Sequence, residues 1–242
     1  MNKPNYITDN DWNLLTTKYQ DNMDYLEAKL KENYPVQYLI GHVDFCGFEI
    51  KCDERAHIAR FDTEFLVDKT VKLASKLGLK SPTILEIGTG TGCISIALAK
   101  LIPGADVLAI DINKEAIELA KENAQLNNVN ITFVHQDIMK VETISGYDIV
   151  ISNPPYIDYN DKMDLENYHE PQNSFFAKNK GLEFYEKIIS QNDNSFKILA
   201  FEIGETQGKA LKNISQRYFP GNNCQIEKDL SGKDRYIFIT KE

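Results

Sequence analysis

The residues Asn153-Pro154-Pro155-Tyr156 combine a hydrogen-bond acceptor, two rigid backbone positions and an aromatic ring. Proline fixes φ and has no N–H, so the carbonyls around the two prolines stay free to accept hydrogen bonds. An NH2 group on a planar amide or base donates two hydrogen bonds, one to the Asn153 side chain and one to the Pro154 carbonyl. The Tyr156 ring offers a surface on which the planar group can stack. The tetrapeptide therefore predicts a catalytic and substrate-binding site for an amide or amino nitrogen.

Holding both N–H groups of an amide would help its nitrogen to accept a methyl group. The lone pair of that nitrogen is delocalised into the carbonyl, and two acceptors can orient it as it becomes tetrahedral. Positioning of this kind contributes about 7–11 kcal/mol in well-aligned cases. No general base is needed, since the proton can leave to water after the transfer. The alternative interpretation of the same residues is a rigid Pro-Pro turn with a packed tyrosine.

A second group of residues, Glu86-Ile87-Gly88-Thr89-Gly90-Thr91-Gly92, predicts a ligand-binding loop between a strand and a helix. Alternating glycines permit positive φ and a close approach of a ligand to the backbone. The dinucleotide pattern GxGxxG is absent because Cys93 stands at its last position, and the triphosphate pattern Gly-Lys-Ser/Thr is absent too. The alternative is a tight turn without a ligand. We expect Glu86 and residues 88–92 to contact a cofactor.

Two carboxylates follow the next predicted strands. Asp111 lies 23 residues after Gly88, where it can accept hydrogen bonds from both ribose hydroxyls, each worth about 1.5–3 kcal/mol, or can cap the next helix. Asp137 can accept from an adenine amino group or lie in a solvated loop. Together these residues suit an adenosine-bearing ligand without a pyrophosphate. S-adenosyl-L-methionine (SAM) fits best, with S-adenosyl-L-homocysteine as its product.

The elements that must position these residues alternate between strands and helices. Apolar spacing predicts one amphipathic helix over residues 12–30, ended by Pro35, then an extended stretch at 36–60 with a hairpin turn at Gly47 and a helix at 63–77. This rhythm predicts a doubly wound α/β sheet with a largely parallel core, and a polar loop over 158–180 beside the site. Further strands are expected at 83–87, 107–110, 131–134, 147–152, 196–203, Ile226 and 236–240, and helices at 94–101, 114–127, 181–189 and 206–218.

Composition narrows the class of protein. The 242 residues allow one large domain with a small appendage, and the formal net charge of −9 leans against a nucleic-acid target, so no stable nucleic-acid binding is expected. The four cysteines show neither a CxxC pair nor metal-ligand spacing, which predicts reduced thiols and no metal. No apolar run is long enough for a membrane span, and the first residues do not resemble a signal peptide. We expect a cytoplasmic monomer.

These motifs resemble the release-factor glutamine N5-methyltransferases, the HemK-type enzymes, over about residues 35–239. Asn-Pro-Pro-Tyr alone is shared with methyltransferases that act on DNA adenine and on bases of ribosomal RNA, so the flanking motifs indicate the protein-glutamine branch. The flanking motifs lie at residues 35–41, 45–47, 60–64, 157, 170–171, 181–185, 202–204, 207–208 and 229–235.

The resemblance implies a class I SAM-dependent methyltransferase fold, Rossmann-like with a doubly wound seven-stranded sheet. Residues 1–34 would form a short N-terminal helical region, 35–62 a β-hairpin linker and 63–242 the methyltransferase domain. SAM would contact Gly88 to Gly92, Asp111, Ile138 and Asn153. The partner would be a peptide chain release factor, whose Gly-Gly-Gln glutamine would sit on Asn153 to Tyr156.

The sequence departs from the family pattern at several positions, and other functions are compatible with some of its motifs. The family usually has an aromatic residue where Ile138 stands, prolines where Ala59 and Phe61 stand, and several helices before Pro35. One competing function is methylation of an amino group on an RNA or DNA base. Another is an inactive SAM-binding protein that docks to translation factors. A nicotinamide-dependent oxidoreductase would leave residues 153–156 unexplained.

Overall fold

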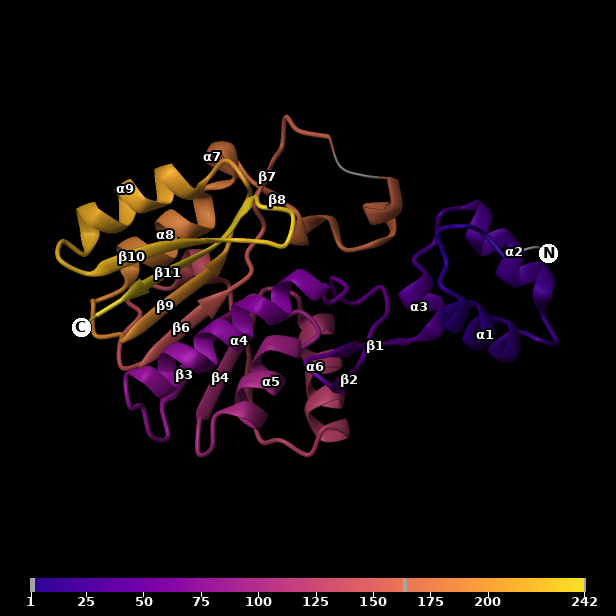
Figure 1. Cartoon of the computed structure of the whole chain (residues 1–242), viewed down its shortest axis with the longest axis horizontal. Coiled ribbons are helices and arrows are strands. Elements are labelled where there is room, and N and C mark those ends of the chain that lie inside the picture. Colours follow the sequence, from indigo (N-terminus) through magenta and orange to yellow (C-terminus); the bar gives the residue numbers. More distant parts are fainter. Residues whose placement is uncertain (1–2, 163–164, 242) are drawn as a thin grey trace.

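The computed structural model describes residues 3–162 and 165–241, and a seven-stranded sheet lies at its centre (Figure 1). The strands follow the order β10-β11-β9-β6-β3-β4-β5. The five strands from β9 to β5 run parallel, whereas β11 is antiparallel to both of its neighbours. This confirms the predicted α/β class. The strands are β3 (Thr83–Ile87), β4 (Asp106–Asp111), β5 (Thr132–His135), β6 (Ile149–Ser152), β9 (Ile198–Glu202), β10 (Asn223–Lys228) and β11 (Asp234–Thr240).

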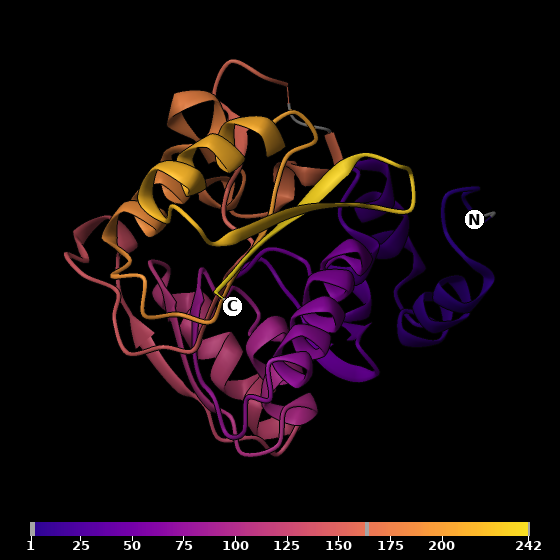
Figure 2. The ribbon, with the colours of Figure 1, turned by 60° about the vertical axis from the view of Figure 1, so that its left-hand side comes forward.

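Helices cover both faces of the sheet, as a doubly wound fold requires (Figure 2). One layer consists of α4 (Phe61–Lys76), α5 (Cys93–Leu101) and α6 (Lys114–Leu126). The other contains α8 (Glu183–Gln191) and α9 (Gly208–Tyr218). Because the central strands are buried on both faces, their apolar runs are nearly continuous and are easy to find in the sequence.

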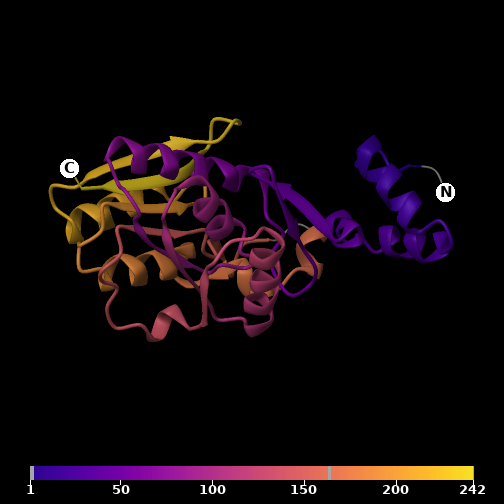
Figure 3. The same cartoon turned by 90° about the horizontal axis from the view of Figure 1, so that it is seen from below.

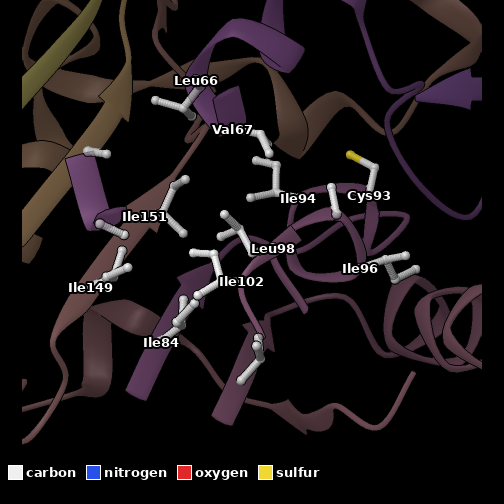
Figure 4. Close-up of a cluster of buried hydrophobic side chains, with 14 of the residues drawn as sticks. Leu66, Val67, Ile84, Cys93, Ile94, Ile96, Leu98, Ile102, Ile149 and Ile151 are labelled. Carbon is white, nitrogen blue, oxygen red and sulfur yellow. The ribbon is translucent and has the colours of Figure 1, made fainter. Parts of the chain in front are cut away.

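A core of buried apolar side chains fills the space between the sheet and the first helical layer (Figure 4). Alternate residues of a strand face opposite sides, so Ile84 of β3 packs in this core while Leu85 faces the other layer. Ile151 of β6, Leu66 of α4 and Leu98 of α5 are fully buried there. Shifting β3 or β6 by one residue would exchange the side chains of the two cores and disrupt the packing on both faces, so packing holds the loops that follow both strands in register.

The N-terminal segment forms two helices, so the prediction of one helix over residues 12–30 is wrong. Helix α1 (Asp9–Lys18) ends at Tyr19, and α2 (Met23–Lys31) begins after a turn at Asn22. A single straight helix would leave its apolar stripe uncovered, whereas the turn lets Leu15 and Leu26 become fully buried in one small core. These helices project from one end of the molecule (Figure 3).

The expectation of extended chain over residues 36–60 is wrong at its start. Val36–Ile40 form helix α3, and Pro35 is its N-cap. Pro35 therefore follows the end of α2 and also begins the next helix. The expected hairpin is confirmed: β1 (His42–Phe45) and β2 (Phe48–Lys51) pair antiparallel around a turn that contains Gly47. The Asn123 side chain of α6 bonds both backbone groups of Lys51, which anchors the hairpin to the sheet domain.

The segment expected as one loop over residues 158–180 contains short elements instead. Strand β7 (Ile157–Asp158) pairs parallel with β8 (Phe176–Ala177), and α7 (Lys178–Gly181) follows. These elements could not be predicted from the sequence, because the segment is polar and because strands of two residues and single helical turns are too short to show a hydrophobic period. Single 3-10 turns are η1 (Ile138–Lys140), η2 (Leu165–His169) and η3 (Gln172–Ser174).

Candidate active site

A cavity of about 710 Å³ lies where the carboxyl ends of β3, β4 and β6 meet. Ligands of open α/β sheets bind at such an edge. All of the site residues predicted from the sequence line this cavity, with the exception of Gly92. The predicted residues in its wall are Glu86, Gly88, Thr89, Gly90, Thr91, Asp111, Asp137, Ile138, Asn153, Pro154, Pro155 and Tyr156.

The glycine loop has one open side and one packed side. Apart from the two chain neighbours of each glycine, no atom of the described residues lies within 4 Å of the point where a side chain would begin at Gly88 or Gly90, so a ligand can approach the backbone there. Gly92 has another purpose: a Cβ at this N-cap of α5 would lie 3.1 Å from the Cβ of Ala120. Gly92 therefore lets α5 and α6 pack closely. Thr89 and Thr91 border the cavity but are themselves buried.

Glu86 ties the loop to the strand before it and the helix after it. Its Oε2 accepts hydrogen bonds from Thr89 Oγ1 at 2.6 Å and from the Ser95 backbone N–H at 3.1 Å, in the first turn of α5. Its Oε1 has no hydrogen-bond partner among the described residues. Complete burial raises the pKa of Glu86 to about 8. Oε1 is thus a buried polar atom without a partner among the described residues, and once the carboxyl is ionised it can accept from a cationic or N–H-bearing ligand.

Asp111 lies at the end of β4 and holds the neighbouring loops. Its Oδ2 accepts from the Gly90 N–H and its Oδ1 from the Asn113 N–H, both at 2.8 Å. Burial raises its pKa. The N-cap of α6 is Asn113, whose side chain accepts from Glu115 N, so the alternative of Asp111 as that cap is wrong. A carboxylate oxygen accepts more than one hydrogen bond, so Asp111 retains capacity for ribose hydroxyls.

The residues that follow β5 form a part of the cavity wall that is both polar and apolar. Asp137 caps η1 by accepting from Met139 N at 2.9 Å, and its side chain also borders the cavity. Ile138 is only 7% exposed and packs in the core, whereas Met139 is 39% exposed. Ile112 and Met139 are thus apolar cavity residues that the sequence reasoning missed. Each directly follows a residue that it did identify, which is the signal that could have found them.

The tetrapeptide after β6 presents its polar groups to the same cavity. Asn153 Nδ2 donates to Thr63 Oγ1 at 3.3 Å, which leaves Asn153 Oδ1 as the acceptor. No described residue donates to the Pro154 carbonyl. The Tyr156 carbonyl accepts from Gln207 Nε2 at 2.9 Å, and burial raises the pKa of the Tyr156 hydroxyl to about 12. The backbone of the tetrapeptide is therefore anchored, while two acceptors remain for a ligand.

Two buried residues behind Asn153 received no role from the sequence. Thr63 in α4 donates to Glu202 Oε2, at the end of β9, over 2.7 Å. Both side chains also border the cavity. Both belong to motifs noted above, but only the folded chain brings α4 and β9 against residue 153.

The segment between β7 and β8 forms another wall of the cavity. Its Glu170 is buried and accepts from the Ile58 backbone N–H at 2.8 Å and from the Arg60 guanidinium. These contacts join the segment to the chain that enters α4. Phe175, Arg60 and Ile58 all line the cavity.

Comparison with known proteins supports a methyltransferase fold and a family. The model of the methyltransferase small domain matches residues 61–169. The release factor glutamine methyltransferase of Lactococcus lactis is 38% identical over 239 residues, covering 96% of this chain and 84% of the relative. The enzyme with the same name from Enterococcus faecalis is 37% identical, covering 86% and 76%.

A solved structure shows the same fold. The ribosomal protein L11 methylase from Lactobacillus delbrueckii subsp. bulgaricus aligns with a TM-score of 0.54 and 22% identity, covering 80% of this chain and 85% of that one. In the described part of the chain, no helix has both the length and the apolar character needed to cross a membrane.

Proposed function

The chain belongs to the release factor glutamine methyltransferase family, and on that premise we propose that it methylates the side-chain amide nitrogen of the glutamine in the Gly-Gly-Gln motif of peptide chain release factors. One observation carries the proposal: the open glycine loop and the Asn153–Tyr156 tetrapeptide border the same cavity. A methyl donor and an acceptor amide can therefore meet there. Because release factors act on ribosomes, we propose the cytoplasm as its place of action.

The cavity fits S-adenosylmethionine as the methyl donor. Gly88 and Gly90 leave space beside the backbone, and Glu86 Oε1 is a buried acceptor without a protein partner among the described residues. An ammonium group suits such an oxygen, and ribose hydroxyls suit Asp111. Ile138 and Met139 offer apolar surface for a base. When bound, this cofactor supplies an activated methyl group on its sulfonium sulfur, and S-adenosylhomocysteine remains after the transfer.

The chain's own residues would bind and orient the acceptor amide. Asn153 Oδ1 and the Pro154 carbonyl would accept its two N–H groups, which fixes the plane of the amide and aims the nitrogen. The Tyr156 ring would pack against that plane. No side chain is required to take the proton, since it can pass to water. Positioning is thus the main contribution of the protein to the rate.

The proposal is tested with radiolabelled SAM and a purified release factor. The control substrate is the same factor with its Gly-Gly-Gln glutamine replaced, and RNA and DNA are offered as competitors. Label on the intact factor alone supports the proposal. Label on nucleic acid would instead indicate a base amino-group methyltransferase, and cofactor binding without any transfer would indicate an inactive docking protein.

A further inference from the structure

We propose that Thr63 and Glu202 are positioning residues that determine which end of the Asn153 carboxamide faces the acceptor nitrogen. This inference rests on the proposed function, because it concerns how the acceptor amide is held. Asparagine has an oxygen and an NH2 group of nearly equal shape, and only the oxygen can accept a hydrogen bond from a substrate N–H.

The three side chains form a chain of hydrogen bonds that starts at the cavity and ends in the protein interior. Asn153 Nδ2 lies 3.3 Å from Thr63 Oγ1, which lies 2.7 Å from Glu202 Oε2. Thr63 and Glu202 are each 3% exposed. They come from α4 and β9, so the chain joins three separate segments of the fold.

The protons available on these three side chains decide which group donates and which accepts in each hydrogen bond. A carboxylate only accepts, so the one hydroxyl proton of Thr63 goes to Glu202. The Thr63 oxygen can then only accept from Asn153, which must turn its NH2 group inward. Asn153 Oδ1 is left for the acceptor amide. In the opposite orientation the Asn153 NH2 group would face the NH2 group of the acceptor amide, and one of the two proposed substrate hydrogen bonds would be lost.

The direction requires Glu202 to be ionised. A protonated Glu202 could donate to Thr63, and the Thr63 proton would then be free for Asn153 Oδ1, which reverses the chain. Burial raises the pKa of Glu202 to about 7, and the nearby Arg235 charge opposes this rise. The charged and titratable groups facing Glu202 come from α4, the loop after β6, α8 and β11: Asp62, Tyr156, Tyr185, Arg235 and Tyr236.

The Glu202→Gln variant keeps the packing around residue 202 but removes the constraint on the direction of the hydrogen bonds. Glutamine has the same shape and can still bond Thr63, but it can do so as donor or acceptor, so both orientations of Asn153 become available. We expect kcat for release-factor methylation to fall about 10-fold or more, because a preorganised polar contact at the reacting group is lost. SAM affinity should stay within about twofold. The wild-type kcat should rise with pH through about 7, and this rise should be absent in the variant.

Variants at Thr63 test the relay itself. Thr63→Val removes the hydroxyl and should lower kcat by a similar factor, while Thr63→Ser keeps it and should restore most of the rate. Thr70→Val is the matched control, since Thr70 is a fully buried threonine of the same helix that bonds the Leu66 carbonyl. Its kcat should equal that of the wild type. Equal rates in wild type, Glu202→Gln and Thr63→Val would overturn the inference, as would failure of Thr63→Ser to restore the rate.

A measurement without substrate keeps this inference separate from the proposed function. The side-chain ¹⁵N–¹H2 signal of Asn153, identified by its loss in Asn153→Ala, should titrate near pH 7 and should shift in Glu202→Gln but not in Thr70→Val. An unresponsive Asn153 signal would overturn the positioning role, even in an active enzyme. A responsive signal in a chain that fails to methylate release factors would instead overturn the proposed substrate.

Discussion

At the scale of single residues, Asn153 and Asp111 are held in different ways. Asn153 contacts Thr63 and, through it, the interior of the protein, but it does not hold the glycine loop. Asp111 bonds the Gly90 and Asn113 backbone and so shapes the loop that would carry the cofactor. Loss of either side chain should therefore affect different steps.

Asn153→Ala should abolish transfer while leaving most of the SAM affinity. The lost acceptor would leave one substrate N–H unpaired and the amide free to turn, and we expect kcat to fall about 100-fold or more. Asp111→Ala should weaken SAM binding about 10- to 100-fold, since charge-assisted hydrogen bonds contribute about 1.5–3 kcal/mol. Calorimetric titration with SAM and single-turnover methylation measure the two effects.

Asp106→Ala, at the exposed opposite end of the same strand, is the control for the Asp111 variant. It should bind SAM as the wild type does. An equal loss of SAM affinity in Asn153→Ala and Asp111→Ala would contradict the division of roles.

Sequence alone could identify residues that follow a recognisable strand, and it failed for those that reach the site from elsewhere. Asn153 and Asp111 each stand at the end of an apolar run, so their place at the sheet edge could be predicted. Thr63 contacts Glu202 across 139 positions of the sequence. Only the packing of α4 on the sheet brings them together, and no local pattern records it.

At the scale of elements, α7 and α9 fasten the tetrapeptide from behind. Gln207, at the N-cap of α9, donates to the Tyr156 and Lys180 carbonyls and accepts from the Gly204 N–H. Gly181, at the end of α7, lies so close that a Cβ would be 2.0 Å from the Tyr156 carbonyl oxygen. The absence of a side chain at residue 181 therefore sets the position of the Tyr156 backbone.

Gly181→Ala should displace Tyr156 and lower activity more than backbone conformation alone explains. Both Gly181 and Gly146 have positive φ, +76° and +79°, so the left-handed backbone costs an alanine about 1–2 kcal/mol at either position. In the part of the chain that the structure describes, no atom outside the two neighbouring residues lies within 4 Å of a Cβ at Gly146, which makes Gly146→Ala the matched control. Methylation should fall at least about 10-fold in the first variant and stay near wild type in the second. Similar rates in both would contradict the role given to Gly181.

The strength of an element's pattern decided which elements could be predicted. The buried strand Thr83–Ile87 has the bounds expected from its apolar run, because it is covered on both faces. The helices α1 and α2 share one continuous apolar stripe, and the turn between them depends on burying Leu15 with Leu26. That burial is a tertiary effect, so a helical period could not reveal the break.

At the scale of the whole molecule, two buried carboxyl groups, those of Glu86 and Glu202, line the cavity of an already acidic chain. Burial raises the pKa of Glu86 to about 8 and that of Glu202 to about 7, from an ordinary value of 4.5. Between about pH 4.5 and 7 the folded chain therefore keeps two protons that the unfolded chain releases. This contribution to stability is fully present below about pH 4.5 and is lost as pH rises through about 7 and 8. Alkaline solution should weaken the fold.

Glu86→Gln should flatten this dependence in the ligand-free chain. The amide keeps the acceptor for Thr89 and Ser95 but has no charge to bury, so at pH 9 the variant should exceed the wild type in free energy of unfolding by about 3–5 kcal/mol. Below pH 5 that advantage should disappear, because Glu86 is then protonated in both states. Urea unfolding between pH 5 and 9 measures the slope. Glu118→Gln, an exposed change on α6, should keep the wild-type slope. If Glu86→Gln kept it as well, the buried Glu86 carboxyl would not be the source of the pH dependence.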